Sequence, residues 1–546
     1  MNQREKLSAE LSRGFSRVPN VVLLAIELLV LLAVLAAAWR ERSPMPLVPI
    51  ADDDTWGYLN PALSWLSGLG LQQTDGREWL YPALLALFLK TTGSFVGIAL
   101  WQKFLGISSG VLMALTWRCW VSTLPLHRWA HFSISLIGAL PLFVQLMNPQ
   151  SVFFEMSIRP EAVLSFFVYG QFACLMGYYK YRWQTPKALP SMILGAAAIF
   201  LSYACLQLKP SWLFACVITS APVFMGVFGR APSLGTRLLA PALGIVFSFL
   251  VLWLPGAAFL IPDRGSRTVL PSTLFTIHAR LIDNSLEAKL AGMSESDPEK
   301  AKLRALVTVL ENEIPIAEKL PSAFTKLGFD PDYLFYRSSL IPAIYRYTGD
   351  DDEKFRAFCI SCYRDAAFHD PLGIGAKGAA QFTYFLFPNS QNFYNERVNF
   401  ARSYVTSAEA LSRRRPELHR EDVREMYRRY QSDLAGQAGR DFPGMVKSKS
   451  GILKNVSRLA PYLEFLYLLT FAASLIWAPL RDLRLSGWAA VSLFSAPLAN
   501  AVLVSMVHAL DNARYRHTFG GFLLFALLAM TVFSSLVIAR SLRHEP

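Results

Sequence analysis

The chain has 546 residues, of which 53% are hydrophobic and 17% are charged, and its formal net charge is +13. Soluble domains usually carry about 25% charged residues, so this composition favours a membrane protein. Much of the positive charge lies in short connections between apolar runs, which argues for charge-directed membrane orientation and against nucleic-acid binding.

Apolar runs of spanning length recur along the chain, and about 17 to 25 residues are needed to cross a bilayer as a helix. The predicted spans are 20–39, 98–117, 129–147, 161–181, 189–207, 211–228, 238–260, 459–479, 488–507 and 518–539. We therefore predict an all-α polytopic membrane protein with about ten transmembrane helices. The first run resembles a signal peptide at both ends, but it is long for one and further spans follow, so we expect a retained helix.

The spans divide the chain into three predicted regions. Residues 1–261 form a membrane module of about seven helices, with a long first outside loop at 40–97. Residues 262–458 are long enough for a core of their own and have mainly helical patterning, so we predict a helical extracytoplasmic domain. Residues 459–546 form a C-terminal membrane module of about three helices.

The orientation follows from the connections. Lys and Arg are denser in the connections on the N-terminal side of the bundle than in the short connections on the other side. By the positive-inside rule the N-terminus is cytoplasmic, and the first loop is extracytoplasmic.

Three consecutive aspartates, Asp52, Asp53 and Asp54, begin the polar part of that loop. One of them would be enough to cap a helix that starts near Thr55. Three adjacent carboxylates repel one another, so we favour a functional interpretation over capping alone. The stretches "TWGYLNPALSWLSGL" and "REWLYPALLALFLKTTG" that follow each have an apolar face, and we predict two helices that lie in the membrane interface.

Other ionisable residues flank the spans on the same predicted side. They are Arg77 in the first loop, Arg159 and Glu161 in "MSIRPE", Lys209 in "LQLKPSW", and His508, Arg514 and Tyr515 in "VHALDNARYRH". Acids and bases that converge at one membrane boundary favour a site for an anionic lipid headgroup and a polar co-substrate. Structural alternatives stay open, since Lys209 can snorkel to headgroups and "RPE" can simply start a helix.

The cysteines and motifs limit the other possibilities. Cys359 and Cys362 form "CISC" in the predicted outside domain, where a local disulfide is the favoured interpretation and a zinc site with His369 is a weaker one. The chain contains neither a phosphate-binding loop of the Walker type nor an H-E-x-x-H motif. A nucleotide-driven pump or a zinc metalloprotease therefore has no support.

Five features of the chain occur in an order that resembles the layout of a known class of proteins. They are the acid-bearing first loop, "RPE" after the third span, "KPS" after the fifth span, the large outside interval and the final "RY". The arrangement is similar to the GT-C membrane glycosyltransferases, specifically the glycosyltransferase family 39-like bacterial relatives of protein O-mannosyltransferases and aminoarabinose transferases. The resemblance covers the first seven spans best and is limited to a shared layout in 262–458. It implies a GT-C-like bundle and a polyprenyl-phosphate sugar donor.

The resemblance also implies roles for individual residues. In "DTWGY" the acid is followed by a tyrosine, Tyr58, as in the family, so Asp54 is the implied catalytic residue and Asp53 the second candidate. The triplet departs from the commoner acidic pair, which leaves the assignment within it open. We expect the donor phosphate to contact Lys209, Arg514 and Arg159, with Asp52, Tyr58, Arg77, Glu161, His508 and Tyr515 in supporting roles.

The sequence therefore predicts a sugar transferase of the bacterial inner membrane, with its site on the periplasmic side. We expect no required cofactor, although a divalent cation stays an alternative because members of the class differ in this respect. The expected partners are the lipid-linked donor, membrane lipids and an acceptor that is a glycan, a lipid or a protein. A lipid or polysaccharide transporter or flippase and a non-catalytic envelope assembly protein are the alternative classes, since each also accommodates about ten spans.

Overall fold

The computed structural model describes residues 19–228, 233–262, 270–320, 333–386, 399–438, 440, 450–507 and 513–542, without the side chains of 383–386, 450–455, 457 and 513–522. Within these residues, 10 helical segments are long and apolar enough to cross a membrane, which confirms the prediction of a helical multi-pass membrane protein. They are Asn20–Arg42 (α2), Val96–Val121 (α5), Arg128–Leu146 (α6, Arg128–Ile137, and α7, Ala139–Leu146), Glu161–Gln184 (α9, Glu161–Tyr179, and one π-helical turn), Ala188–Leu208 (α10), Pro210–Phe228 (α11, Leu213–Met225), Leu234–Phe259 (α12, Leu234–Phe247, and α13, Leu254–Phe259), Arg458–Ile476 (in α22, Ser450–Ile476), Ala478–Val507 (α23, Arg484–Val507) and Leu523–Ser541 (in α24, Ala513–Ser541).

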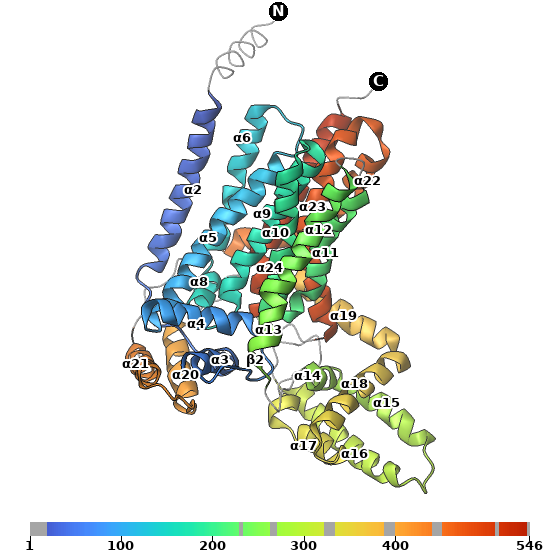
Figure 1. Cartoon of the computed structure of the whole chain (residues 1–546). Coiled ribbons are helices and arrows are strands. Elements are labelled where there is room, and N and C mark those ends of the chain that lie inside the picture. The colour runs from blue at the N-terminus through green and yellow to red at the C-terminus, as the bar shows by residue number, and fades with distance from the viewer. Residues whose placement is uncertain are drawn as a thin grey trace, which may run out of the picture.

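The spans lie side by side in one bundle, with α2 at its edge (Figure 1). Only 11% of the apolar window of α2 is buried, against 72% in the span that begins at Glu161. Helix α9 is therefore central, and it packs between α5 and α10. Both ends of α9 are fixed by this packing, so a residue at its first turn has a defined position.

The exposed helix α2 is held to the bundle by a buried ion pair at its C-terminal end. The guanidinium of Arg42 donates from Nε and Nη2 to the two carboxylate oxygens of Glu155 in α8 (Pro149–Met156), with 2.7 Å for the Nη2–Oε1 contact. Arg42 also donates to the carbonyls of Ala38 and Leu146, and its side chain is 1% exposed. Lys103 in α5 donates to the carbonyl of Met45, 3.0 Å away. This helix with little buried apolar surface is thus fixed by polar contacts at its C-terminal end, and Glu27 in its first half forms a second ion pair with Arg118 of α5.

Replacement of Arg42 by Met should therefore destabilise the protein strongly. It leaves the Glu155 carboxylate buried without its guanidinium, and breaking such a pair costs about 3–5 kcal/mol. Thermal unfolding of the purified protein measures the loss, with Arg40→Met as the matched control because Arg40 is exposed on the same helix. The double variant Arg42→Met/Glu155→Leu should recover much of the stability. Equal effects of Arg40→Met and Arg42→Met would contradict the anchoring role.

The first loop forms the two helices predicted for it, α3 (Trp56–Leu66) and α4 (Leu80–Thr92). Helix α4 lies across the ends of the spans, and α3 lies below it in Figure 1, at the end of the bundle opposite the first residues of α2. Between them a two-residue strand β1 (Leu71–Gln72) pairs in parallel with β2 (Leu260–Ile261), directly after α13. This pairing ties the first loop to the seventh span.

The interval 262–458 contains two groups of helices with different packing partners. Helices α14 (Leu270–Ile277), α15 (Ala279–Gly292), α16 (Pro298–Lys319), α17 (Leu340–Tyr347) and α18 (Asp352–His369) share a core of their own. Helix α19 (Pro371–Leu386) leads back to α23. Helices α20 (Phe400–Ser412) and α21 (Glu421–Gln437) instead pack into the core of the membrane helices and the first loop. The interval therefore reaches the aspartate-bearing loop directly.

The two cysteines of "CISC" are not joined in the disulfide that the sequence analysis favoured. Cys359 and Cys362 are both free thiols, buried on the inner face of α18, so the expected disulfide is wrong for this structure. Burial raises the pKa of both thiols, to about 12 for Cys362. His369 is exposed at the end of the same helix, and among the described residues no group of three His, Cys, Asp or Glu side chains is placed to hold a metal ion.

Candidate functional site

A short backbone pairing brings the aspartates beside the connection between α8 and α9. The amide of Ile50 donates to the carbonyl of Met156 at 2.7 Å, and the amide of Ile158 donates to the carbonyl of Ile50 at 2.9 Å. Both segments are extended here and run parallel. Asp52 follows Ile50 by two residues and Arg159 directly follows Ile158, so the pairing places the acids and the arginine side by side.

Asp52 has a structural task at this position. Its Oδ1 accepts from the amide of Thr55 at 3.0 Å, and the Thr55 hydroxyl accepts in turn from the amide of Asp52 at 2.9 Å, which forms a capping box. Its other carboxylate oxygen, Oδ2, accepts from Nε of Arg159. The capping alternative offered by the sequence therefore applies to Asp52.

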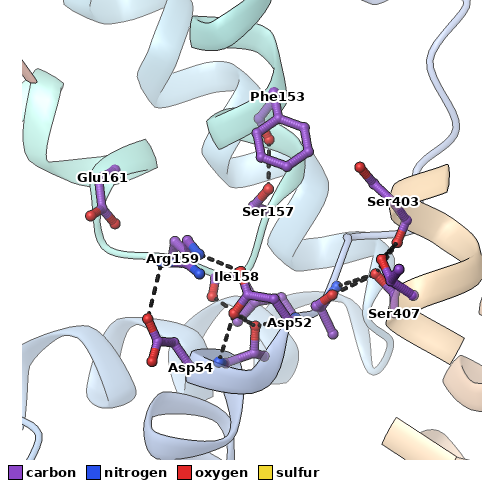
Figure 2. Close-up of polar contacts among 12 residues, drawn as sticks. Asp52, Asp54, Phe153, Ser157, Ile158, Arg159, Glu161, Ser403 and Ser407 are labelled. Atoms are coloured by element: carbon purple, nitrogen blue, oxygen red, sulfur yellow. Dashed lines mark hydrogen bonds and ion pairs between the residues drawn. The ribbon is translucent and has the colours of Figure 1, made fainter. Parts of the chain in front are cut away.

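Asp54 lies between two guanidinium groups. Its Oδ1 accepts from Nη2 of Arg77 at 3.1 Å, and its Oδ2 accepts from Nη1 of Arg159 at 3.3 Å. Figure 2 shows Arg159 between Asp52 and Asp54, with Glu161 close by. The Asp54 side chain keeps 31% of its surface exposed, so the carboxylate is both fixed and accessible. Asp53 is exposed and has no ion pair within the described part of the chain.

Two tyrosines extend the site away from the aspartates. The Arg77 guanidinium lies over the ring of Tyr58, 5.0 Å from its centroid, and Tyr58 meets the ring of Tyr81 edge-on at 5.2 Å. Nε2 of Gln102 donates to the Tyr81 hydroxyl at 2.8 Å. Burial raises the pKa of Tyr81 well above its ordinary value, and the nearby charges of Glu161 and Asp52 raise it further. Tyr81 is therefore a neutral phenol near the carboxylates of Glu161 and Asp52.

Lys209 and Glu161 form a second, more buried pair. Nζ of Lys209 donates to Oε1 of Glu161 at 3.0 Å, and the two side chains are 8% and 4% exposed. Glu161 lies in the first turn of α9 and Lys209 directly follows α10, positions at which the helix dipoles favour these charges. "RPE" thus does start a helix, α9, as one alternative from the sequence analysis held. The charge of Lys209 is compensated by the Glu161 carboxylate.

A small pocket opens beside Glu161, between α5, α7, α8 and α9. Polar side chains on its wall include Ser109, Ser151, Ser165, Glu155 and Glu161. Several of these groups already have protein partners, since Glu155 pairs with Arg42 and the Ser109 and Ser151 hydroxyls donate to backbone carbonyls.

The structure brings together Asp52, Asp54, Tyr58, Arg77 and Arg159, with the Lys209–Glu161 pair adjacent. His508 lies outside the described residues, and of Arg514 and Tyr515 only the backbone in α24 is described. The roles expected for these three residues therefore stay predictions.

Several residues of the site carried no clear signal in the sequence. Ser407 and Tyr404 in α20 and Tyr430 in α21 contact the backbone before Asp52 from more than 350 positions away along the chain. An amphipathic helix pattern marks such residues as inward-facing but does not identify what they face.

Comparison of the chain with protein-family profiles, with curated proteins and with solved structures finds no match. The geometry of the site is therefore the ground for the function proposed below.

The two kinds of ion pair should respond differently to loss of the cation. Lys209→Met leaves Glu161 buried without its ammonium, which costs about 3–5 kcal/mol. Arg77→Met removes a pair in which both side chains are about 30% exposed, worth about 0–1 kcal/mol. Thermal unfolding of both variants measures the difference, and Lys209→Met/Glu161→Gln should regain much of the loss. The reverse order of stability would show that Lys209–Glu161 is not a structural pair.

Proposed function

We propose that this protein is a GT-C-like membrane glycosyltransferase that moves a sugar from a polyprenyl-phosphate donor to a hydroxyl acceptor on the extracytoplasmic side. The single observation that carries the proposal is Asp54, an accessible carboxylate between Arg77 and Arg159 at the ends of the spans. The proposal also rests on the sequence order of the charged loops and on the ion pairs that join the first loop to Arg159 and the start of α9 to the end of α10.

In the proposed reaction the acceptor oxygen attacks the anomeric carbon as the bond from that carbon to the phosphate oxygen breaks. The Asp54 carboxylate takes the acceptor proton, and the polyprenyl phosphate leaves with the electron pair. Such transfers pass through an oxocarbenium-like transition state. The negative charge of Asp54 then stabilises the developing positive charge at the anomeric carbon, so orientation by two arginines matters more than strong basicity.

The departing phosphate gains negative charge, which nearby guanidinium groups stabilise. Arg159 and Arg77 are the partly exposed cations, at 16% and 27% of their side-chain surface. Lys209 is buried against Glu161 and adds positive electrostatic potential near the site. The phosphate contact expected of Arg514 stays a prediction. We propose that the donor phosphate binds on the Arg159 side of Asp54.

Asp54→Asn should lower sugar transfer by about 10²–10⁴-fold, the usual contribution of a general base, while the variant folds and inserts normally. Transfer from a radiolabelled polyprenyl-phosphate sugar by the purified full chain in lipid nanodiscs measures it. Asp53→Asn is the matched control and should change the rate less than threefold, roughly the scale of a surface substitution. Full activity of Asp54→Asn, or loss of activity in Asp53→Asn alone, would remove Asp54 from the proposed role.

The product should have the anomeric configuration opposite to that of the donor. One base and direct displacement invert the centre, whereas retention requires a second carboxylate as nucleophile. Asp52 is engaged in the capping box and with Arg159, which leaves Asp54 as the base next to the arginines. The anomeric proton coupling in the NMR spectrum of the product measures the outcome, and a retained configuration would refute direct displacement.

A transporter is the second candidate because one span carries an acidic residue of unexplained purpose. Glu464 lies within Arg458–Ile476, and its Oε1 is buried without a hydrogen-bond partner within the described residues. Ionisable residues inside spans mark transport pathways in many membrane proteins. Movement of the labelled lipid between leaflets of a vesicle without sugar transfer would favour this class over the transferase.

A further inference from the structure

The segment just before the aspartates has an unusual backbone. Pro46 and Pro49 fix their own φ angles and disfavour helix in the residues before them, so residues 46–51 are non-helical, with bends at 47 and 48 before the bridge at Ile50. The buried carbonyl and amide groups of a non-helical segment need hydrogen-bond partners outside it. The pairing of Ile50 with the α8–α9 connection provides partners for that residue alone.

The other partners come from the hairpin formed by α20 and α21. The Tyr404 hydroxyl donates to the carbonyl of Val48 at 2.8 Å, and the Tyr430 hydroxyl donates to the carbonyl of Pro49 at 2.7 Å. The amide of Ala51 donates to Oγ of Ser407 at 3.1 Å, and that hydroxyl is within donating distance of the Ala51 carbonyl. The one hydroxyl proton of Ser407 can go either to that carbonyl or to the carbonyl of Ser403 in its own helix, 2.6 Å away, and in both cases the hydroxyl accepts from the Ala51 amide. Figure 2 shows Ser407 on the opposite side of the segment from the α8–α9 connection.

These contacts are buried and rigid. Ser407 and Tyr404 are fully buried, and Tyr430 is 1% exposed. The ring of Tyr430 stacks on Phe95, with centroids 3.8 Å apart and planes within 3°. On the outer side, the Arg414 guanidinium lies 5.9 Å from the ring centroid of Trp56, two residues beyond Asp54. The hairpin therefore contacts the aspartate loop on both sides of the acids.

We propose that the α20–α21 hairpin is a positioning element of the aspartate site, which acts through Ser407, Tyr404 and Tyr430 on the backbone of residues 48–51. Asp52 directly follows Ala51, and Asp54 is three residues from it, so a loosened segment displaces the carboxylate relative to Arg77 and Arg159. A displacement of about 1 Å lowers catalysis by about 10²-fold in well-ordered sites. The proposal rests on the proposed sugar transfer for its kinetic consequence but not for its structural one.

The test compares Ser407→Ala with Thr406→Ala in the full chain in nanodiscs. Thr406 is the matched control, because it lies next to Ser407 on α20, is exposed, and bonds only to carbonyls of its own helix. Hydrogen exchange of the backbone amides of residues 50–55 is the first measurement. We expect Ser407→Ala to speed that exchange by about tenfold, the scale of one lost buried hydrogen bond, while exchange in the α14–α18 helices and the thermal midpoint change little. Thr406→Ala should match the wild type.

Sugar transfer is the second measurement. We expect Ser407→Ala and Tyr404→Phe to lower kcat about 10- to 100-fold, with KM for the donor within about threefold, because they displace the base without touching the substrate. Unchanged exchange at 50–55, or a kcat loss equal to that of Thr406→Ala, would overturn the proposal. If Ser407→Ala speeds exchange at 50–55 but the wild type transfers no sugar, the positioning role of the α20–α21 hairpin stands and the proposed function is overturned instead.

Discussion

The site depends on the hydrogen bonding of one non-helical segment, residues 48–51. Residues 49–51 are buried, and Pro49 within the segment and Pro46 just before it disfavour a helix that would satisfy the polar groups internally. The partners come from the α8–α9 connection on one side and from the α20–α21 hairpin on the other. Three regions separated by roughly a hundred residues or more must therefore fold together before the aspartates have a defined position. The acids themselves contribute little to that order, since only Asp52 caps a helical turn.

The same geometry explains how three adjacent aspartates are tolerated. Like charges in sequence repel, yet the capping box and the Arg159 guanidinium compensate Asp52, and Arg159 and Arg77 compensate Asp54. Asp53 projects into solvent, where its charge is screened. Each carboxylate thus has a different environment, although the sequence presents them as equivalent. Only the arrangement around Arg159 distinguishes a structural acid from an accessible one.

The spans were predictable because length and hydrophobicity alone decide them. The predicted span 189–207 differs from Ala188–Leu208 by one residue at each end. The association of Arg159 with the aspartates followed from the common side of their loops, although nothing in the sequence indicated that a single guanidinium bridges two of them. Ser407 and Tyr404 could not be recognised, because hydrophobic periodicity says which face of α20 is inward and not what it meets. The prediction of a "CISC" disulfide is wrong because both cysteines lie on one helix, α18, and pack as free thiols in the same apolar core.

The cations near the site also differ in burial, and burial decides which of them can bind an incoming anion. Lys209 and Glu161 are both under 10% exposed, so an anion that bound Lys209 directly would have to displace Glu161 and leave its carboxylate buried and uncompensated. Arg159 and Arg77 share their donors between partly exposed carboxylates and solvent, so a phosphate can share them with Asp54 at small cost. A guanidinium has five donors in a planar fork and can contact a carboxylate and a phosphate at once. The arginines beside Asp54, rather than the buried lysine, are therefore the groups suited to exchange partners in the sugar transfer that we propose.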